Sequence, residues 1–462
     1  MSQHLWSGRF DSAPDPAAFD FGVSFPFDRR LFEDDVTGSM AWADALHQAG
    51  ILDGKDAGAI TQALAAILEQ GRSDPAWVTG PDEDVHSFVE RQLIARVGDA
   101  GRRLHTGRSR NEQVSVDLRL YLRRRIPVLQ KKIAAVIEAF ADQAERAGDA
   151  LMPSYTHMRR AMPVLVSHFL LSHAAALRRD HRRLEAAREE ANALPLGSGA
   201  IAGTGYAVDT QALAARLGFS RVVTNSMDAS SDRDFAASFL HAASLAMVHL
   251  SRIAEDFILM TSEEFGFFEL ADSSATGSSM MPQKKNPDPL ELVRGKAGRA
   301  IGHLTGFLVT MKGLPTGYNK DLQEDKEPLF DVEDTLAVSM GATAAVVGKL
   351  TLNRDRTGRA ASGLLLATDV ADYLVARGMP FRQAHEVVGA MVRGLLGEKR
   401  DFEDLTLAEW RKASDLFGDD VKAQITAAAS VRARRTPQST HPDAVAAALA
   451  ETRSWLARQA AL

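Results

Sequence analysis

The stretch LRLYLRRRIPVLQKKIAAVIEAFADQA, residues 118–144, decides the fold class. Its apolar side chains recur at steps of three, four and seven, which places them on one face of an α-helix. The residues of this stripe are Leu118, Leu122, Leu129, Ile133, Val136, Phe140 and Ala144. Pro127 interrupts the stripe, so it either kinks the helix or restarts it. A helix longer than the usual ~10–14 residues must bury such a stripe against other helices.

Four more stretches repeat this apolar period and predict four further long helices, within residues 170–184, 235–260, 290–311 and 329–347. Long helices with apolar stripes bury those stripes against one another, which predicts a helix bundle. Strand signals are sparse, and RVVTN at 221–225 is the best candidate. The predicted fold is therefore all-α, that is mostly helical, with small β pieces.

The two ends of the chain differ from its middle. Residues 1–108 contain shorter helical segments that Gly and Pro interrupt, and a new pattern begins near residue 362. In that last part Gly378 fits the position just after a helix, and Pro380 fits the start of the next one. We predict three domains: an N-terminal helical domain 1–108, a central helix-bundle domain 109–361 and a C-terminal helical domain 362–462.

Composition narrows the class of protein. The formal net charge of −6 disfavours a nucleic-acid binder, which is more often basic. The chain has no cysteine, which excludes disulfides, thiol nucleophiles and thiolate metal sites. No secretory signal and no run of about 18 apolar residues is visible, so we expect a cytoplasmic protein without a membrane span.

One motif resembles a nucleotide site. PLGSGAIAG, residues 195–203, contains a G-x-G-x-x-A match. The dinucleotide fingerprint needs a strand before it and a helix after it, whereas the residues before this match are strongly helical. A loop between helices is the better interpretation.

Polar residues gather in two stretches near the start of the long helix. DEDVHSFVERQL holds Asp84 and His86, and LHTGRSRNEQ holds Arg110 and Asn111. A helix start and arginines both favour anions, so this array predicts a binding site for an acidic group. A capped helix start with solvated arginines explains the same residues equally well.

Three later stretches also carry polar groups that core packing does not require. PSYTHMRRAMP, residues 153–163, holds His157, which can act as a general acid or base near neutral pH. GSSMMPQKKNP, residues 277–287, follows GFFELADSSATG, and together they predict a mobile loop from Gly266 to a helix start near Pro287; its Ser278 could be a base only if its alkoxide were stabilised, for instance by Lys284. LPTGYNKDLQEDKEPLF, residues 314–330, adds polar donors that suggest a binding wall.

Together these stretches resemble a known family. GSSMMPQKKNP is similar to the signature G-S-S-x-x-M-P-x-K-x-N-P of the fumarase/aspartase superfamily. LHTGRSRNEQVSVDLRLYLR, LPLGSGAIAG, NSMDASSDRDF, YNKDLQEDKE, LATDVADYLVARGMPFRQAHE and the N-terminal LWSGRF resemble its argininosuccinate lyase branch. The resemblance spans nearly the whole chain and is weakest in the last fifty residues.

The resemblance implies a fold, a reaction and an assembly. Members of the family have three mostly helical domains and form homotetramers in which each active site takes segments from three subunits. They cleave argininosuccinate reversibly to arginine and fumarate, a step of arginine biosynthesis, by anti elimination through a carbanion. No metal or organic cofactor is implied.

The resemblance also assigns roles to residues. Ser278 resembles the base that removes the Cβ proton, and His157 the acid that protonates the leaving nitrogen. Glu291 would orient His157, while Lys284 and Asn286 would hold the carboxylate on which charge grows. The remaining matches to substrate contacts or nearby positions are Ser24, Asp84, His86, Arg110, Asn111, Thr156, Arg233, Tyr318, Gln323 and Lys326.

The chain departs from the family around His157. The family reads T-H-L-Q-x-A-Q-P, whereas residues 156–163 carry Arg159 and Met162 in place of the two glutamines. Three other functions stay open at this point. They are a lyase that releases fumarate from adenylosuccinate, malate or aspartate, a non-catalytic crystallin-like protein, and a regulatory binding module.

Overall fold

The computed structural model describes residues 15–460. LWSGRF, at residues 5–10, therefore lies outside the described residues. Within the described range, no helix combines the length and the apolarity needed to cross a membrane.

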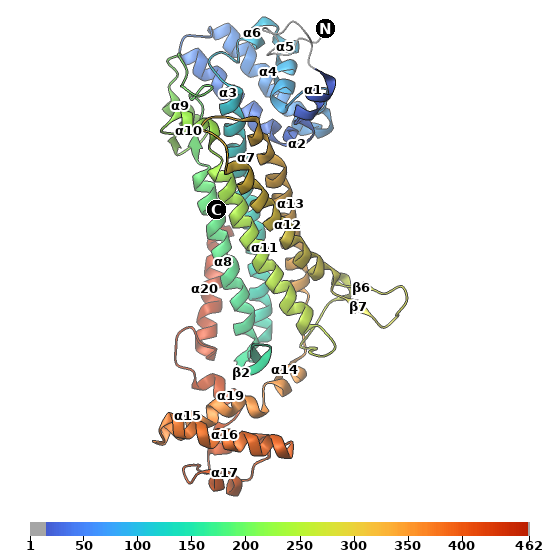
Figure 1. Cartoon of the computed structure of the whole chain (residues 1–462), viewed down its shortest axis with the longest axis vertical. Coiled ribbons are helices and arrows are strands. Elements are labelled where there is room, and N and C mark those ends of the chain that lie inside the picture. Colours follow the sequence, from blue (N-terminus) through green and yellow to red (C-terminus); the bar gives the residue numbers. More distant parts are fainter. Residues whose placement is uncertain (1–14, 461–462) are drawn as a thin grey trace. The chain divides into compact units, whose positions relative to one another are not determined.

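Five long helices dominate the structure (Figure 1): α7 (Arg110–Ala147), α8 (Val166–Glu190), α11 (Asp234–Met260), α12 (Asp288–Met311) and α13 (Lys326–Gly348). Each predicted stripe lies within one of them. The stripe of α7 is buried along its whole length, from Leu118 to Ala144. Pro127 lies inside α7, so the helix does not restart there. The prediction of a mostly helical fold is confirmed.

Side-chain contacts tie these helices into a bundle. Phe140 of α7 stacks on Phe257 of α11, with ring centroids 6.1 Å apart. The buried amide of Gln143 donates to the carbonyl oxygens of Val347 and Leu350, at 2.8 and 2.9 Å. Because the last carbonyls of a helix lack partners within it, this amide from α7 satisfies the end of α13.

The chain forms two compact units. Unit 1 comprises the described residues up to Leu129 together with Arg183–Ser244 and Arg299–Asp334, and unit 2 comprises Gln130–Arg182, Leu245–Gly298 and the described residues from Thr335 onward. Each long helix has residues in both units. The division into domains at residues 108 and 361 stays a prediction.

Unit 1 adds short helices and one small sheet to its parts of the long helices. The sheet pairs β3 (Ala193–Leu194) in parallel with β4 (Arg221–Val222), which confirms the strand candidate at 221–225. The helices are α1 (Pro16–Gly22), α2 (Phe25–Asp28), α3 (Phe32–Gln48), α4 (Gly54–Ser73), α5 (Val85–Val97), α6 (Asp99–Arg102), α9 (Thr210–Arg216), α10 (Ser226–Ser231) and the 3₁₀ helices η2 (Arg29–Leu31), η3 (Pro75–Trp77) and η5 (Lys320–Asp325).

Unit 2 contains the other strands, in three antiparallel pairs. They are β1 (Leu151–Thr156) with β2 (Arg159–Leu165), β5 (Phe268–Glu269) with β8 (Thr351–Leu352), and β6 (Thr276–Gly277) with β7 (Lys285–Asn286). The first pair is a hairpin that the sequence did not predict. A 3₁₀ turn, η4 (Asp272–Ser274), precedes β6.

In the C-terminal part of unit 2, the helices within residues 363–425 surround an apolar cluster that includes Trp410 and Phe417. Gly378 follows α15 with φ +93° and Pro380 precedes α16, as the sequence predicts. The elements are α14 (Arg354–Ala360), η6 (Gly363–Leu366), α15 (Ala367–Ala376), α16 (Phe381–Glu398), η7 (Phe402–Asp404), α17 (Leu407–Ala413), α18 (Val421–Gln424), α19 (Ala427–Ala433) and α20 (Pro442–Ala460).

Candidate functional site

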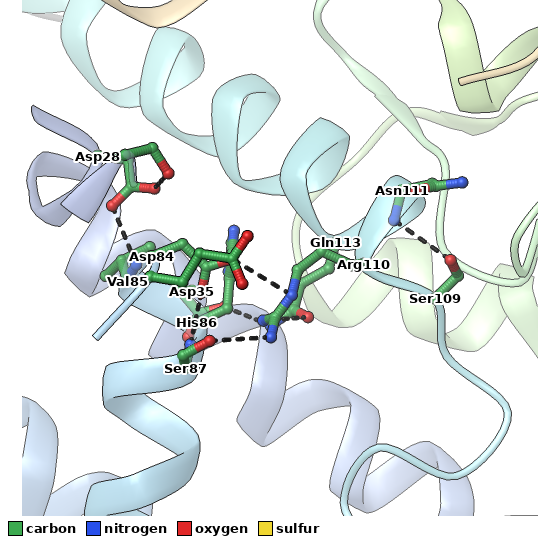
Figure 2. A network of polar contacts seen from close by, with 12 residues as sticks. Asp28, Asp35, Asp84, Val85, His86, Ser87, Ser109, Arg110, Asn111 and Gln113 are labelled. Carbon is green, nitrogen blue, oxygen red and sulfur yellow. Dashed lines mark hydrogen bonds and ion pairs between the residues drawn. The ribbon is translucent and has the colours of Figure 1, made fainter. Parts of the chain in front are cut away.

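The start of α5 forms one wall of a polar network in unit 1 (Figure 2). Asp84 caps this helix by accepting from the backbone N–H of Ser87 at 2.7 Å. Arg110, at the start of α7, places Nε 3.5 Å from Asp84 Oδ2 and donates from Nη2 to Ser87 Oγ at 3.4 Å. Burial opposes the charge of Asp84, but Arg110, His86 and the Ser87 hydrogen bond outweigh it and lower the pKa of this carboxyl. Asp84 and Arg110 therefore stand as a charged pair at the ends of two helices.

Ser24 joins this network through a residue that sequence reasoning missed. Its hydroxyl donates to Asp28 Oδ2 at 2.5 Å, and Asp28 Oδ1 accepts from the backbone N–H of Val85 at 2.9 Å. Burial raises the pKa of Asp28. Gln323 closes the same side by donating to the carbonyl oxygen of Gly22 at 3.2 Å. Ser24 thus reaches the first turn of α5 through Asp28, and Gln323, from a distant part of the chain, binds the backbone two residues before Ser24.

Two buried cations share one buried carboxylate nearby. Asp325 accepts from Arg233 Nε at 2.6 Å and from Lys326 Nζ at 2.8 Å. Arg233 Nη2 is buried and has no hydrogen-bond partner among the described residues. Burial raises the pKa of the Tyr318 hydroxyl; the charge of Arg233 opposes this rise, and the charges of Asp325 and Asp84 add to it. Because two cations face one anion here, an acidic ligand would complete the balance of charge.

A buried carboxylate holds the glycine-rich loop that resembles a nucleotide motif. Glu112 accepts from the backbone N–H groups of Ser109, Gly197 and Gly199 at 3.0, 2.8 and 3.0 Å. Asn111, beside it, donates to the carbonyl oxygen of Ala200 at 3.2 Å. The loop therefore directs its N–H groups at a protein carboxylate, in the place where a nucleotide motif would hold phosphate.

This arrangement predicts the effect of Glu112→Ala. The change leaves three backbone donors without their acceptor, and a buried orphan donor costs about 1–3 kcal/mol. We expect the free energy of unfolding to fall by about 2 kcal/mol or more, measured by urea denaturation. Glu69→Ala, which removes an exposed carboxylate on α4, is the control and should leave that free energy unchanged. Equal effects of the two changes would contradict the role of Glu112.

His86 lies in the core of unit 1 and is 2% exposed. Its Nδ1 is 2.8 Å from Asp35 Oδ1 and 3.3 Å from Asp117 Oδ2. Its imidazole thus lies against two buried carboxyl groups.

In unit 2, His157 occupies the tip of the β1–β2 hairpin. His157 and Met158 both have positive φ, 53° and 59°, a conformation that costs a non-glycine residue roughly 1–3 kcal/mol. Thr156 pairs with Arg159 across the hairpin, and Ser154 Oγ bonds both the N–H and the carbonyl oxygen of Met162. The hairpin thus holds an exposed imidazole in a strained turn, and Arg159 and Met162 lie in its second strand.

Arg159 also lines an open cavity of about 970 Å³ in unit 2. The other lining residues include Tyr155, Met158, Arg160, Glu264, Phe265, Arg356, Arg359 and Asp401. Arginine in place of the family's glutamine therefore adds positive charge to a cavity that borders the hairpin.

The signature loop, residues 277–287, projects from the rest of unit 2 on a two-stranded stalk formed by β6 and β7 (Figure 1). Ser278 Oγ accepts from the backbone N–H groups of Met280 and Met281 at 3.2 and 3.0 Å. Two backbone donors aimed at one hydroxyl oxygen would stabilise an alkoxide there, a source of stabilisation that the sequence alone did not supply. Lys285 is bound to Asp272 at 2.7 Å, whereas Lys284 Nζ forms no hydrogen bond or ion pair among the described residues. Lys284 is thus the lysine of the loop that is free to meet a ligand.

Asn286 lies in β7, at the end of this loop, and Glu291 follows in α12. Asn286 donates weakly to Thr276 at 3.5 Å, and Glu291 is exposed in the first turn of α12. Within the part of the chain that the structure describes, the side chains of His157 and Glu291 form no hydrogen bond with each other. Nor does either bond Ser278. In unit 1 the structure thus brings Ser24, Asp84 and Arg110 to the first turn of α5 and joins Arg233 to Lys326 through Asp325, whereas no such bond joins the hairpin to Ser278 or Glu291 among the described residues.

Sequence reasoning missed the buried carboxyl groups that organise the network, Asp28, Asp35, Glu112, Asp117 and Asp325. Asp325 lies within the recognised stretch YNKDLQEDKE, and Glu112 and Asp117 lie within LHTGRSRNEQVSVDLRLYLR, so membership of these stretches was the available signal. The sequence around Asp28 and Asp35 does not distinguish these residues from surface acids, because their roles depend on contacts with α5 and α7.

Two family models match the chain. A family described as "Lyase" matches residues 8–302, and one described as "Argininosuccinate lyase C-terminal" matches residues 364–432. Among curated relatives, the argininosuccinate lyase of Desulforudis audaxviator is 46% identical over 455 residues, which are 98% of this chain and 99% of that protein. That of Roseiflexus castenholzii is 46% identical over 452 residues, with the same coverage.

Solved structures agree on the fold. A variant of EDDS lyase with bound fumarate has a TM-score of 0.83 at 26% identity, covering 98% of this chain and 92% of that one. A class II fumarase from Schistosoma mansoni has a TM-score of 0.75 at 16% identity, covering 87% and 90%. At the lower identity the likeness concerns the fold alone.

Proposed function

Because the chain belongs to the argininosuccinate lyase family and is therefore a carbon–nitrogen lyase, we propose that it splits argininosuccinate into arginine and fumarate with Ser278 as base and His157 as acid. The observation that carries the activity is the 46% identity to argininosuccinate lyases over almost the full length of both chains. The two backbone donors at Ser278 Oγ support the assignment of the base.

The proposed reaction is a reversible anti elimination in which the protons balance. The Ser278 alkoxide removes the Cβ proton and becomes a hydroxyl, and the electron pair forms a carbanion next to a carboxylate. The carbon–nitrogen bond then breaks, the pair forms the double bond of fumarate, and protonated His157 gives its proton to the leaving nitrogen of arginine. Return of one proton from Ser278 to His157, through solvent, restores both groups.

The charge that the reaction develops needs cations. The substrate carries three carboxylates, and charge grows on one of them as the carbanion forms. Lys284 and Asn286 would meet that carboxylate. Arg110, Arg233 and Lys326 of unit 1, with Ser24, Asn111, Tyr318, Gln323 and Thr156, would hold the rest of the substrate, and Asp84 would keep Arg110 in place.

The proposed assembly is a homotetramer with shared sites, in the cytoplasm. The resemblance to a family in which each active site takes segments from three subunits supports sites built from different subunits. The mass of the purified protein in light scattering tests the tetramer. Mixed assemblies of Ser278→Ala and His157→Asn chains test the sharing: we expect activity to return, because some sites then receive an intact copy of both residues. No recovery after exchange of subunits would contradict it.

We expect Lys284→Met to lower kcat by about 10²–10³-fold, the usual effect of removing one group that stabilises transition-state charge. Turnover of argininosuccinate at saturation measures it. Lys285→Met is the matched control, because Lys285 Nζ is already engaged by Asp272. It should retain most of its activity. An equal loss in both variants would mean that the loop requires charge in general and would contradict the specific role of Lys284.

A further inference from the structure

Asp35 of α3 is the centre of a buried cluster in unit 1 that the proposed reaction does not use. Asp35 and Asp117 are 1% and 0% exposed. Asp35 Oδ1 receives His86 Nδ1 of α5 at 2.8 Å and Gln113 Nε2 of α7 at 2.6 Å. Arg108 is buried beside them and donates to Ser39 at 3.1 Å. The Asp35 carboxylate therefore joins three helices.

Asp117 of α7 is the unusual member of this cluster. One of its oxygens, one of Asp35 and a ring nitrogen of His86 all lie within 4.8 Å of one another. Both Asp117 oxygens are buried, and no N–H or O–H of the described residues forms a hydrogen bond to them. As a carboxylate, Asp117 would be a buried charge beside the Asp35 anion, which is costly, and Arg108, which opposes this repulsion, donates to Ser39 and not to Asp117. As a carboxylic acid, it can donate its proton to Asp35.

The electrostatics agree with this division of charge. Burial raises the pKa of Asp117 well above its ordinary value, and repulsion from Asp35 and Asp34 adds to the effect. Burial also opposes the charge of Asp35, but His86, Arg108 and the Gln113 hydrogen bond outweigh it and lower the pKa of Asp35 to about 2. Both effects favour a charged Asp35 beside a neutral Asp117.

The cluster stands directly behind the wall of the active site. His86 lies between Val85, whose N–H is held by Asp28, and Ser87, whose N–H is held by Asp84. Asp117 lies two turns after Arg110 on α7. A displacement of His86 would therefore move the first turn of α5 relative to Arg110, and with it the Asp84–Arg110 pair.

We propose that Asp117 is a positioning residue of the lyase, a buried neutral carboxyl group that donates to Asp35 and thereby fixes His86 and the first turn of α5. The proposal rests on the proposed role of the Asp84–Arg110 wall in holding substrate. Asp35, His86 and Asp117 also have the residue types of a cation site. The buried guanidinium of Arg108 and the two donors already on Asp35 disfavour a divalent cation there.

Two substitutions of similar volume test the proposal. Asp117→Asn keeps a donor in place of the carboxyl O–H, so we expect its kcat/KM to stay within about three-fold of the unmodified enzyme. Asp117→Leu removes the donor, so we expect kcat/KM to fall by about 10²-fold, mainly through KM, because a small misplacement of binding groups has that effect. Circular dichroism checks that both variants fold. Loss of activity in Asp117→Asn equal to that in Asp117→Leu would overturn the proposal, as would unchanged kinetics in Asp117→Leu.

A second measurement does not depend on activity or on how Asp117→Leu folds. Infrared difference spectra of the unmodified enzyme and Asp117→Asn at neutral pH should contain the carbonyl band of one protonated carboxyl group that the variant lacks. Absence of that band would overturn the proposal. Arg110→Met tests the role of the Asp84–Arg110 wall in binding substrate separately from the protonation of Asp117. Normal KM in that variant, together with the infrared band, would count against the substrate wall and leave the protonation of Asp117 in place.

Discussion

Ser278→Ala is expected to lower kcat by about 10²–10⁴-fold, the range for loss of a positioned general base. The hydroxyl oxygen of Ser278 accepts hydrogen bonds from two backbone N–H groups of its own loop, and these donors would stabilise the alkoxide of the proposed base. Those hydrogen bonds are local to an exposed loop on the β6–β7 stalk. We therefore expect the free energy of unfolding to change by less than about 1 kcal/mol.

The neighbouring Ser279 supplies the matched control for this prediction. It is exposed in the same loop, and its side chain accepts neither of those N–H groups. Ser279→Ala should turn over argininosuccinate close to the unmodified rate in a continuous assay of fumarate. A folded Ser278→Ala protein that works as fast as Ser279→Ala would remove Ser278 from the mechanism.

His157→Asn is expected to lower kcat by a similar factor, about 10²–10⁴-fold, because asparagine cannot deliver the proton that the leaving nitrogen needs. The choice of asparagine separates chemistry from fold. His157 has φ 53°, and asparagine adopts this left-handed conformation more readily than most residues. The free energy of unfolding should therefore stay the same or rise slightly.

Met158→Gly is the control for the hairpin tip, because Met158 has φ 59° and glycine adopts such a conformation without strain. We expect this variant to gain up to about 1 kcal/mol of stability and to retain most of its kcat. Thermal denaturation and steady-state kinetics on the same preparations measure both quantities. Full activity in His157→Asn, or equal loss in Met158→Gly, would contradict the role of the imidazole.

The sequence predicted the bundle because a long apolar stripe has one stable outcome, burial against other helices. Leu118 and Phe140 lie 22 residues apart in that stripe, and both are 0% exposed. The hairpin at 151–165 could not be predicted in the same way. Its strands carry Arg159 and Arg160 where alternation of apolar residues would have signalled β structure, and two non-glycine residues form its tip.

The residues of the candidate site likewise fall into those that the sequence could predict and those that it could not. Solvent-accessible groups within motifs, such as the half-buried Ser278 and the exposed Lys284, were visible in the sequence because core packing does not explain them. Asp35 and Asp117 were not, because only the packing of α3, α5 and α7 makes one a buried anion and the other its neighbour. A resemblance names residues that contact a substrate more readily than residues that hold those contacts in place.

Fumarate release by the purified full-length protein tests the central claim most directly. Argininosuccinate, adenylosuccinate, malate and aspartate are offered separately, and ultraviolet absorbance follows the product. We predict release from argininosuccinate alone. Release from one of the other three alone would keep an elimination mechanism and contradict the choice of substrate, and silence on all four from a folded tetramer would contradict catalysis itself.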